Sequence, residues 1–177
     1  MHTHTSLKTL LLASACALSS SLYAQAPGSG TPQTAAESPN AAFVQQAGQG
    51  GMAEVALSKL ALDLAKSPQV RQFAQKMVQD HTANNKQLAT IAAHENIQVP
   101  IDLDSEHAHL RERLEGKRGA DFDRAYVDAM RADHQKMADL LKSSQATVNT
   151  EELRAFIKTT LPVVEAHLRM AQDLKVE

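Results

Sequence analysis

Apolar residues recur every three or four positions along most of this chain. That spacing places them on one face of an α-helix, whereas the strict alternation typical of strands is absent. Prolines, glycines and polar runs divide the pattern into long helices over residues 41–66, 68–95 and 120–143, a short helix over 105–115, and a last long helix capped by Thr150. We therefore predict an all-α fold, an antiparallel four-helix bundle with a short extra helix in the connection between the second and third long helices. A looser helical array is the alternative.

Each long helix carries one polar residue where its inward-facing row requires an apolar one. These residues are Glu54, His81, His134 and His167, and the third long helix adds Asp123. Burying Glu54 alone would be costly or would force its protonation, whereas nearby imidazoles or a cation offset that cost. One interruption on each helix therefore predicts a shared polar site in the core.

Two of these histidines end a repeated pattern, FAQKMVQDH at residues 73–81 and YVDAMRADH at residues 126–134. Counting from a turn near residue 67.5 places Glu54 and His81 at one level, about 20 Å from that turn. The same count from a turn near residue 147 places His167 about 10 Å from the level of His134. Straight helices therefore predict that His167 lies apart, unless the connection before the last helix is staggered.

The ligand types indicate a single metal ion rather than a pair. A ferritin-type dinuclear centre requires inward Glu-x-x-His pairs, and Val78, Arg131 and Val164 stand where those glutamates would be. Three histidines and one glutamate suit one Zn, Fe, Mn or Cu ion. We predict a transition-metal site with the ligands Glu54, His81, His134 and His167. A metal-free buried polar network is the alternative, and a haem or other ligand is a third one.

Methionines bear on the choice of metal. Each lies three or four residues from one of the histidines: Met77, Met130, Met137 and Met170. Thioether and imidazole ligands together favour Cu(I), although methionine is also a common core filler.

Several other polar positions lie near the predicted site. Asp80 and Asp133 directly precede two of the histidines, and adjacent helical residues do not face each other. Each aspartate therefore reaches the next helix or stays solvated at the edge. We interpret the remaining histidines as surface residues: His94, His107 and His109.

The chain shows no catalytic motif. No nucleophilic triad is visible, and the glycines of residues 48–51 follow no strand, so they form no phosphate-binding loop. We interpret this GQGG segment as locally flexible. The sequence therefore favours a non-enzymatic protein, without excluding an enzyme.

The amino-terminal region has the features of a secretory signal. Lys8 precedes an apolar run over residues 9–22, which is too short to span a bilayer, and Ala24 offers a cleavage position. A lipid anchor at Cys16 is the minor alternative. We predict a signal peptide over residues 1–24, a disordered linker rich in Pro, Gly and Ser over 25–40, and the bundle domain over 41–177.

Removal of the signal would leave a protein without cysteine, carrying 17 basic residues against 20 acidic ones. The mature chain has five aromatic residues and no basic patch, so nucleic-acid binding is not supported. No later segment is apolar enough to cross a membrane, and we predict a periplasmic or otherwise exported protein. No motif indicates a particular protein partner, and a homo-oligomer is an open alternative to a monomer.

Six motifs occur in a fixed order: F-V-x-x-A, G-G-M-A-E-V-A-L, K-M-V-x-D-H, F-D-R-A-Y, M-x-x-D-H and L-P-x-x-x-x-H-L. Over residues 41–175 the chain resembles the bacterial family named domain of unknown function 4142. The resemblance implies a ferritin-like four-helix topology and export, and it implies no activity. The positions typical of that family are Glu54, Asp80, His81, Asp123, Tyr126, Asp133, His134 and His167.

Three functions remain open from the sequence. The first is a module that binds a transition metal in its core. The second is a metal-dependent redox or stress-related enzyme. The third is a metal-free structural or interaction protein of the cell envelope, which would use the amphipathic segment 105–115 as its docking surface.

Overall fold

The computed structural model describes residues 38–176. The predicted signal peptide, and the predicted linker up to residue 37, lie outside this range. Within it, every regular element is helical: α1 (Pro39–Leu64), α2 (Pro68–His94), α3 (Ser105–Glu115), α4 (Gly119–Ser144) and α5 (Glu151–Asp173). None of these helices combines the length and the apolar character that a membrane span requires.

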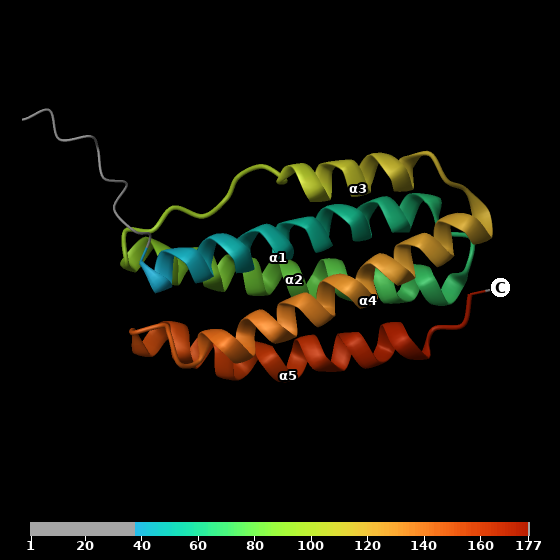
Figure 1. The fold of residues 1–177 in the computed structure, drawn as a ribbon. Coiled ribbons are helices and arrows are strands. Elements are labelled where there is room, and N and C mark those ends of the chain that lie inside the picture. Colours follow the sequence, from blue (N-terminus) through green and yellow to red (C-terminus); the bar gives the residue numbers. More distant parts are fainter. Residues whose placement is uncertain (1–37, 177) are drawn as a thin grey trace, which may run out of the picture. The chain divides into compact units, whose positions relative to one another are not determined.

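The four long helices form the predicted antiparallel bundle (Figure 1). α1 packs against α2 and α4, and α5 packs against the same two helices. The connection over residues 95–118 contains α3, which lies beside α1 and α4, and it returns along the bundle before α4 begins. As a result, α2 and α4 run in the same direction on one diagonal of the bundle, and α1 and α5 occupy the other.

Serine and proline together fix the starts of the first two helices. The hydroxyl of Ser38 accepts a hydrogen bond from the backbone N–H of Ala41, and Ser67 accepts one from Val70. A proline follows each serine, where its missing N–H costs nothing. Thr150 directly precedes α5 as predicted, but its hydroxyl donates to Glu95 at the end of α2 instead of capping its own helix. That contact joins the connection after α2 to the connection before α5.

Asp123 accounts for the extra polar position in α4. Its carboxylate accepts hydrogen bonds from the backbone N–H groups of Lys66 and Ser67, at 3.0 and 2.7 Å. These two residues form the turn between α1 and α2. A buried side chain of α4 therefore holds the first hairpin in place, and Asp123 is not part of the histidine site.

We expect Asp123→Ala to lower the free energy of unfolding by about 2 kcal/mol, because it leaves two turn N–H groups without their acceptor. Chemical denaturation measures the change. Asp121→Ala is the matched control, since its side chain is 73 % exposed and pairs with Arg124 at the surface. The control should stay within about 0.5 kcal/mol of the wild type. Equal losses in the two variants would contradict a special role for Asp123.

The apolar core consists of two clusters. One contains Phe43, Leu88, Leu153 and Ile157, and the other contains Leu57, Met77, Phe122 and Tyr126, each with further neighbours. On each long helix one polar residue separates the part that belongs to one cluster from the part that belongs to the other. These residues are Glu54, His81, His134 and His167. The core is therefore interrupted by one polar layer.

The interpretation of residues 48–51 as a flexible segment was wrong, because these residues lie within the uninterrupted helix α1. Each glycine allows another element to approach closely. A Cβ atom on Gly50 would stand 2.6 Å from Cε of Met137, and one on Gly48 would stand 2.8 Å from Cδ of Pro100. A larger residue at Gly48 would push the connection at Pro100 away from α1, whereas one at Gly50 would displace the flexible end of the Met137 side chain.

Candidate metal centre

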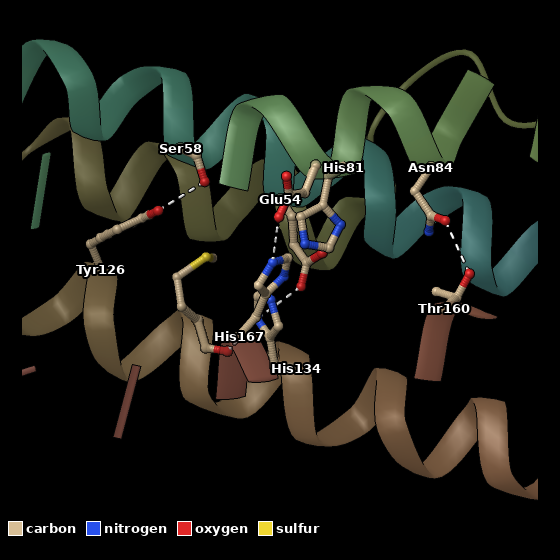
Figure 2. Close-up of polar contacts among 10 residues, drawn as sticks. Glu54, Ser58, His81, Asn84, Tyr126, His134, Thr160 and His167 are labelled. Atoms are coloured by element: carbon tan, nitrogen blue, oxygen red, sulfur yellow. Dashed lines mark hydrogen bonds and ion pairs between the residues drawn. The ribbon is translucent and has the colours of Figure 1, made fainter. Parts of the chain in front are cut away.

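The structure brings together all four predicted site residues, one from each long helix (Figure 2). Glu54, His81, His134 and His167 are each at most 3 % exposed. The three imidazole rings are mutual neighbours, with centroid distances of 5.3, 5.2 and 5.5 Å. We call His81, His134 and His167 the trihistidine cluster.

The repeated nine-residue pattern is explained by this arrangement. Its two copies lie on α2 and α4, the diagonal pair of helices that run in the same direction. Equivalent positions therefore face each other across the bundle axis at one level, and His81 meets His134 there.

The residue count that places His167 about 10 Å from the level of His134 assumes straight, even helices, and the ring distances of 5.2 and 5.5 Å show that this assumption fails. His134 stands ten residues before the end of α4, whereas His167 stands sixteen residues after the start of α5. At about 1.5 Å per residue, α5 must begin about 9 Å farther out than α4 ends. The connection over residues 145–150 covers this distance along the bundle axis. It is therefore the staggered connection that would bring His167 to the level of His134.

One nitrogen of each ring is held by a neighbouring group. Nδ1 of His81 lies 2.7 Å from Glu54, Nδ1 of His134 lies 2.8 Å from the backbone carbonyl of Met130, and Nε2 of His167 lies 2.8 Å from Asp80. Such contacts fix the orientation of a ring and decide which nitrogen carries the proton.

The other nitrogen of each ring is buried and has no hydrogen-bond partner among residues 38–176. These atoms are Nε2 of His81, Nε2 of His134 and Nδ1 of His167. The three rings can present nitrogens that all lie within 4.8 Å of one another. Buried polar atoms normally have partners. Three buried nitrogens without partners on adjoining rings are therefore candidate ligands for a metal ion. An ion bound by three imidazoles would satisfy all of them.

Glu54, which lies on α1, contacts the rings of His81 and His134. Its carboxylate oxygens lie 2.7 Å from Nδ1 of His81 and 3.1 Å from Nδ1 of His134. Neither contact has the geometry of a hydrogen bond, so the carboxylate acts on both rings through its charge. The two nitrogens of an imidazole point in different directions, and Glu54 therefore lies on the side of these rings away from the orphaned Nε2 atoms.

The electrostatics identify His81 as the charged partner of Glu54. Burial opposes ionisation of Glu54, yet the surrounding histidines lower its pKa to about 2. Burial likewise opposes protonation of His81, but Glu54 outweighs it and raises the pKa of this imidazole. Burial lowers the pKa of His134, and it lowers that of His167 to about 4. At neutral pH His134 and His167 are therefore uncharged, whereas Glu54 favours the protonated form of His81.

The two aspartates of the repeat differ in their partners. Asp80 reaches the next helix, α5, where it binds His167, and it also binds Lys76. Asp133 lies on the side of α1 and α3, in a pocket that Gly50 and His107 also line. Its Oδ2 is buried and unpaired within the described part of the chain. Burial, together with the charge of Glu54, raises the pKa of Asp133 to about 6.

The remaining histidines lie apart from the cluster. His94 and His109 are exposed as predicted, with weak contacts of 3.4 Å to Glu152 and Glu112. His107 is not a surface residue, because its side chain is only 12 % exposed and binds Asp104 at 2.8 Å. Asp104 caps the short α3 helix by accepting a hydrogen bond from the backbone N–H of His107, and His107 lies outside the trihistidine cluster.

Two polar pairs beside the site were not predicted from the sequence. The hydroxyls of Ser58 and Tyr126 lie 2.8 Å apart, one helical turn from Glu54, and Tyr126 is fully buried. Thr160 donates to Asn84 at 3.0 Å on the opposite side of the cluster (Figure 2). Ser58, Asn84 and Tyr126 lie three or four residues from a polar core residue of the same helix, and Thr160 lies seven residues from His167. That helical spacing was the available signal.

These observations define a class: a helical-bundle protein with a buried histidine cluster that has the geometry of a candidate metal centre. The chain belongs to the family described as Domain of unknown function (DUF4142), whose sequence pattern matches residues 25–174. None of the curated proteins matches the chain significantly.

Solved structures share the fold. A DUF305 fragment from Deinococcus radiodurans is 14% identical, with a TM-score of 0.67 over 76% of this chain and 93% of that one. CopM in its Cu(II)-bound form is 15% identical, with a TM-score of 0.64 over 75% and 93% of the two chains. A DUF305 protein from Streptomyces coelicolor is 15% identical, with a TM-score of 0.67 over 78% and 91%. At these identities the likeness concerns the fold alone.

Proposed function

We propose that this protein is an exported module that binds one transition-metal ion through the trihistidine cluster. The observation that carries the proposal is the set of three buried ring nitrogens, one per histidine, that have no partner among residues 38–176. Export rests on the signal-like pattern of residues 1–24.

The donor set favours copper or zinc. Neutral imidazole suits both ions, and two of the three rings are neutral at neutral pH because burial lowers the pKa of His134 and His167. The existence of CopM structures with Cu(II) and with Ag, on the same fold, supports testing copper first. Met77 and Met130 are fully buried in the adjoining core, and they are the thioethers to examine if copper binds.

In this proposal the carboxylates act through the histidines. Glu54 orients His81 and His134 and supplies negative charge to a site whose own ligands are neutral. Asp80 does the same for His167. The proton that His81 carries in the metal-free site must leave before its nitrogen can bind an ion. Metal binding is therefore accompanied by proton release.

Metal analysis of residues 25–177 tests the proposal. The tag-free protein is purified from the periplasm beside the double variant His81→Ala/His134→Ala, and both are then titrated with Cu(I), Zn(II), Fe(II) and Mn(II). We expect near one equivalent of copper or zinc in the wild type and none in the variant. A wild type that takes up none of the four ions would reduce the cluster to a structural polar network held by the Glu54–His81 ion pair.

A further inference from the structure

The trihistidine cluster is sealed in the present conformation, since its rings are at most 3 % exposed. An ion must therefore reach it through an opening between helices. Two surface pockets approach the polar layer, one on each side of the bundle, and they differ in which residues form their walls.

The first pocket lies between α2 and α5 and has a volume of about 340 Å³. Two members of the cluster, His81 and His167, line it directly, together with Asp80. We call it the α2–α5 pocket. Its other walls include the Asn84–Thr160 pair, and Ala83 and Val163 are exposed at its outer edge.

The second pocket lies beside α1, α3 and α4 and has a volume of about 350 Å³. It is lined by Asp133, Lys136 and Met137, but by no member of the cluster. Its salt bridge between Glu106 and Lys136, at 2.6 Å, ties α3 to α4 across this side. Of the two pockets, only the α2–α5 pocket has cluster histidines in its wall.

Packing and charge favour the same side. α2 and α5 pack against each other less extensively than either packs against its hairpin partner. Asp80 is 25 % exposed, and one of its oxygens lies 2.8 Å from Nε2 of His167. The same oxygen lies 2.8 Å from Nζ of Lys76, so an arriving cation would displace a surface ammonium group that is itself half exposed. This carboxylate is in contact with both solvent and the cluster.

We propose that the α2–α5 pocket is the route by which a metal ion reaches the trihistidine cluster, with Asp80 as the carboxylate that receives the ion before the histidines do. The proposal rests on the metal-binding function proposed above. Carboxylate oxygen is a common ligand for divalent cations, and a negative group at the mouth of a cleft raises the local cation concentration.

Blocking the pocket tests the route without changing a ligand. Ala83→Trp fills it from α2 and Val163→Trp fills it from α5, while Ala132→Trp adds the same side chain to an exposed position on α4. Stopped-flow uptake and chelator-driven release are measured with the ion that binds stoichiometrically, Cu(I) or Zn(II). We expect both rates to fall by about tenfold or more in the two pocket variants, with an unchanged Kd, because a barrier on the route leaves both end states the same.

Charge removal gives a second, independent measurement. Asp80→Asn and Asp133→Asn each delete one aspartate that precedes a histidine of the repeat, so their net charges match. We expect Asp80→Asn to slow uptake by about tenfold and to weaken its dependence on salt, and Asp133→Asn to leave both unchanged.

The outcomes separate the route from the site. Uptake at wild-type rates in both pocket variants would overturn the route and leave the metal site standing. Equal slowing by Asp80→Asn and Asp133→Asn would overturn the role of Asp80. A wild type that binds neither ion would overturn the proposed function, and the route with it.

Discussion

Replacing Glu54 with glutamine is expected to lower the free energy of unfolding of the metal-free protein by about 3 kcal/mol. Glutamine cannot balance the charge on His81, which is almost fully buried. The imidazole must then lose its proton or remain as an uncompensated charge in the core. Chemical denaturation near pH 6 measures the loss.

The matched control is a histidine–glutamate pair at the surface. Glu152 and His94 lie 3.4 Å apart with side chains 54 % and 62 % exposed. Glu152→Gln should change the free energy of unfolding by no more than about 0.5 kcal/mol, because exposed ion pairs contribute little. A loss of similar size in the two variants would show that burial does not strengthen the Glu54 pair.

The stability difference between wild type and Glu54→Gln should also depend on pH. The pKa of Glu54 falls from 4.5 to about 2 on folding, so its contribution is present above pH 4.5 and is lost as the pH falls toward 2. The pKa of His81 rises from 6.5 on folding, so its contribution is present below pH 6.5 and is lost as the pH rises through the raised value. The difference should therefore be largest between about pH 4.5 and 6.5. A difference that grew steadily toward pH 2 would contradict the ion pair.

Metal loading should produce the second large effect. An ion supplied at 100 times its Kd stabilises the folded state by about 2.7 kcal/mol, which raises the midpoint of thermal unfolding by roughly 10 °C. Alanine at any one of His81, His134 or His167 should remove most of this increase, because each supplies one of three ligands. Scanning calorimetry with and without the ion measures it.

The triple variant His94→Ala/His107→Ala/His109→Ala is the control for that experiment. It removes three histidines at once, two more than each single variant, and all three lie outside the trihistidine cluster. It should retain the full metal-dependent increase, and a chelator should reverse that increase. An increase that survived alanine in the cluster and vanished in this triple variant would place the metal at the surface.

The bundle could be predicted because each long helix buries one continuous row of side chains. The row on α4 illustrates this, since Val127, Met130, His134 and Leu141 recur at helical spacing and all are buried. Periodicity also identified the four polar residues that meet in the core, Glu54, His81, His134 and His167. It did not reveal Val148, which is 1 % exposed although it lies in a connection, because a connection has no period.

The level of Glu54 and His81 was predictable for a different reason. A connection of three residues, 65–67, joins α1 to α2 and leaves little freedom in their register. The connection between α4 and α5 has six residues, and its path along the bundle decides where His167 lies. Counting residues cannot give that path. Small rotations of whole helices decide which ring nitrogen makes each contact, so the sequence could not predict this choice. They also decide whether Asp80 contacts α5 or stays in solvent, and the sequence left both alternatives open.

The glycines of α1 have a consequence for the order of folding. Each glycine costs about 1 kcal/mol of intrinsic helix stability relative to alanine, and three of them lie within residues 48–51. This segment gains its stability from Pro100, Met137 and Asn85, which pack where side chains would otherwise stand. We therefore expect α1 to become ordered only after α2 and α4 offer that surface. The carboxylate that organises the histidines would then be carried into the core by a helix that forms after α2 and α4.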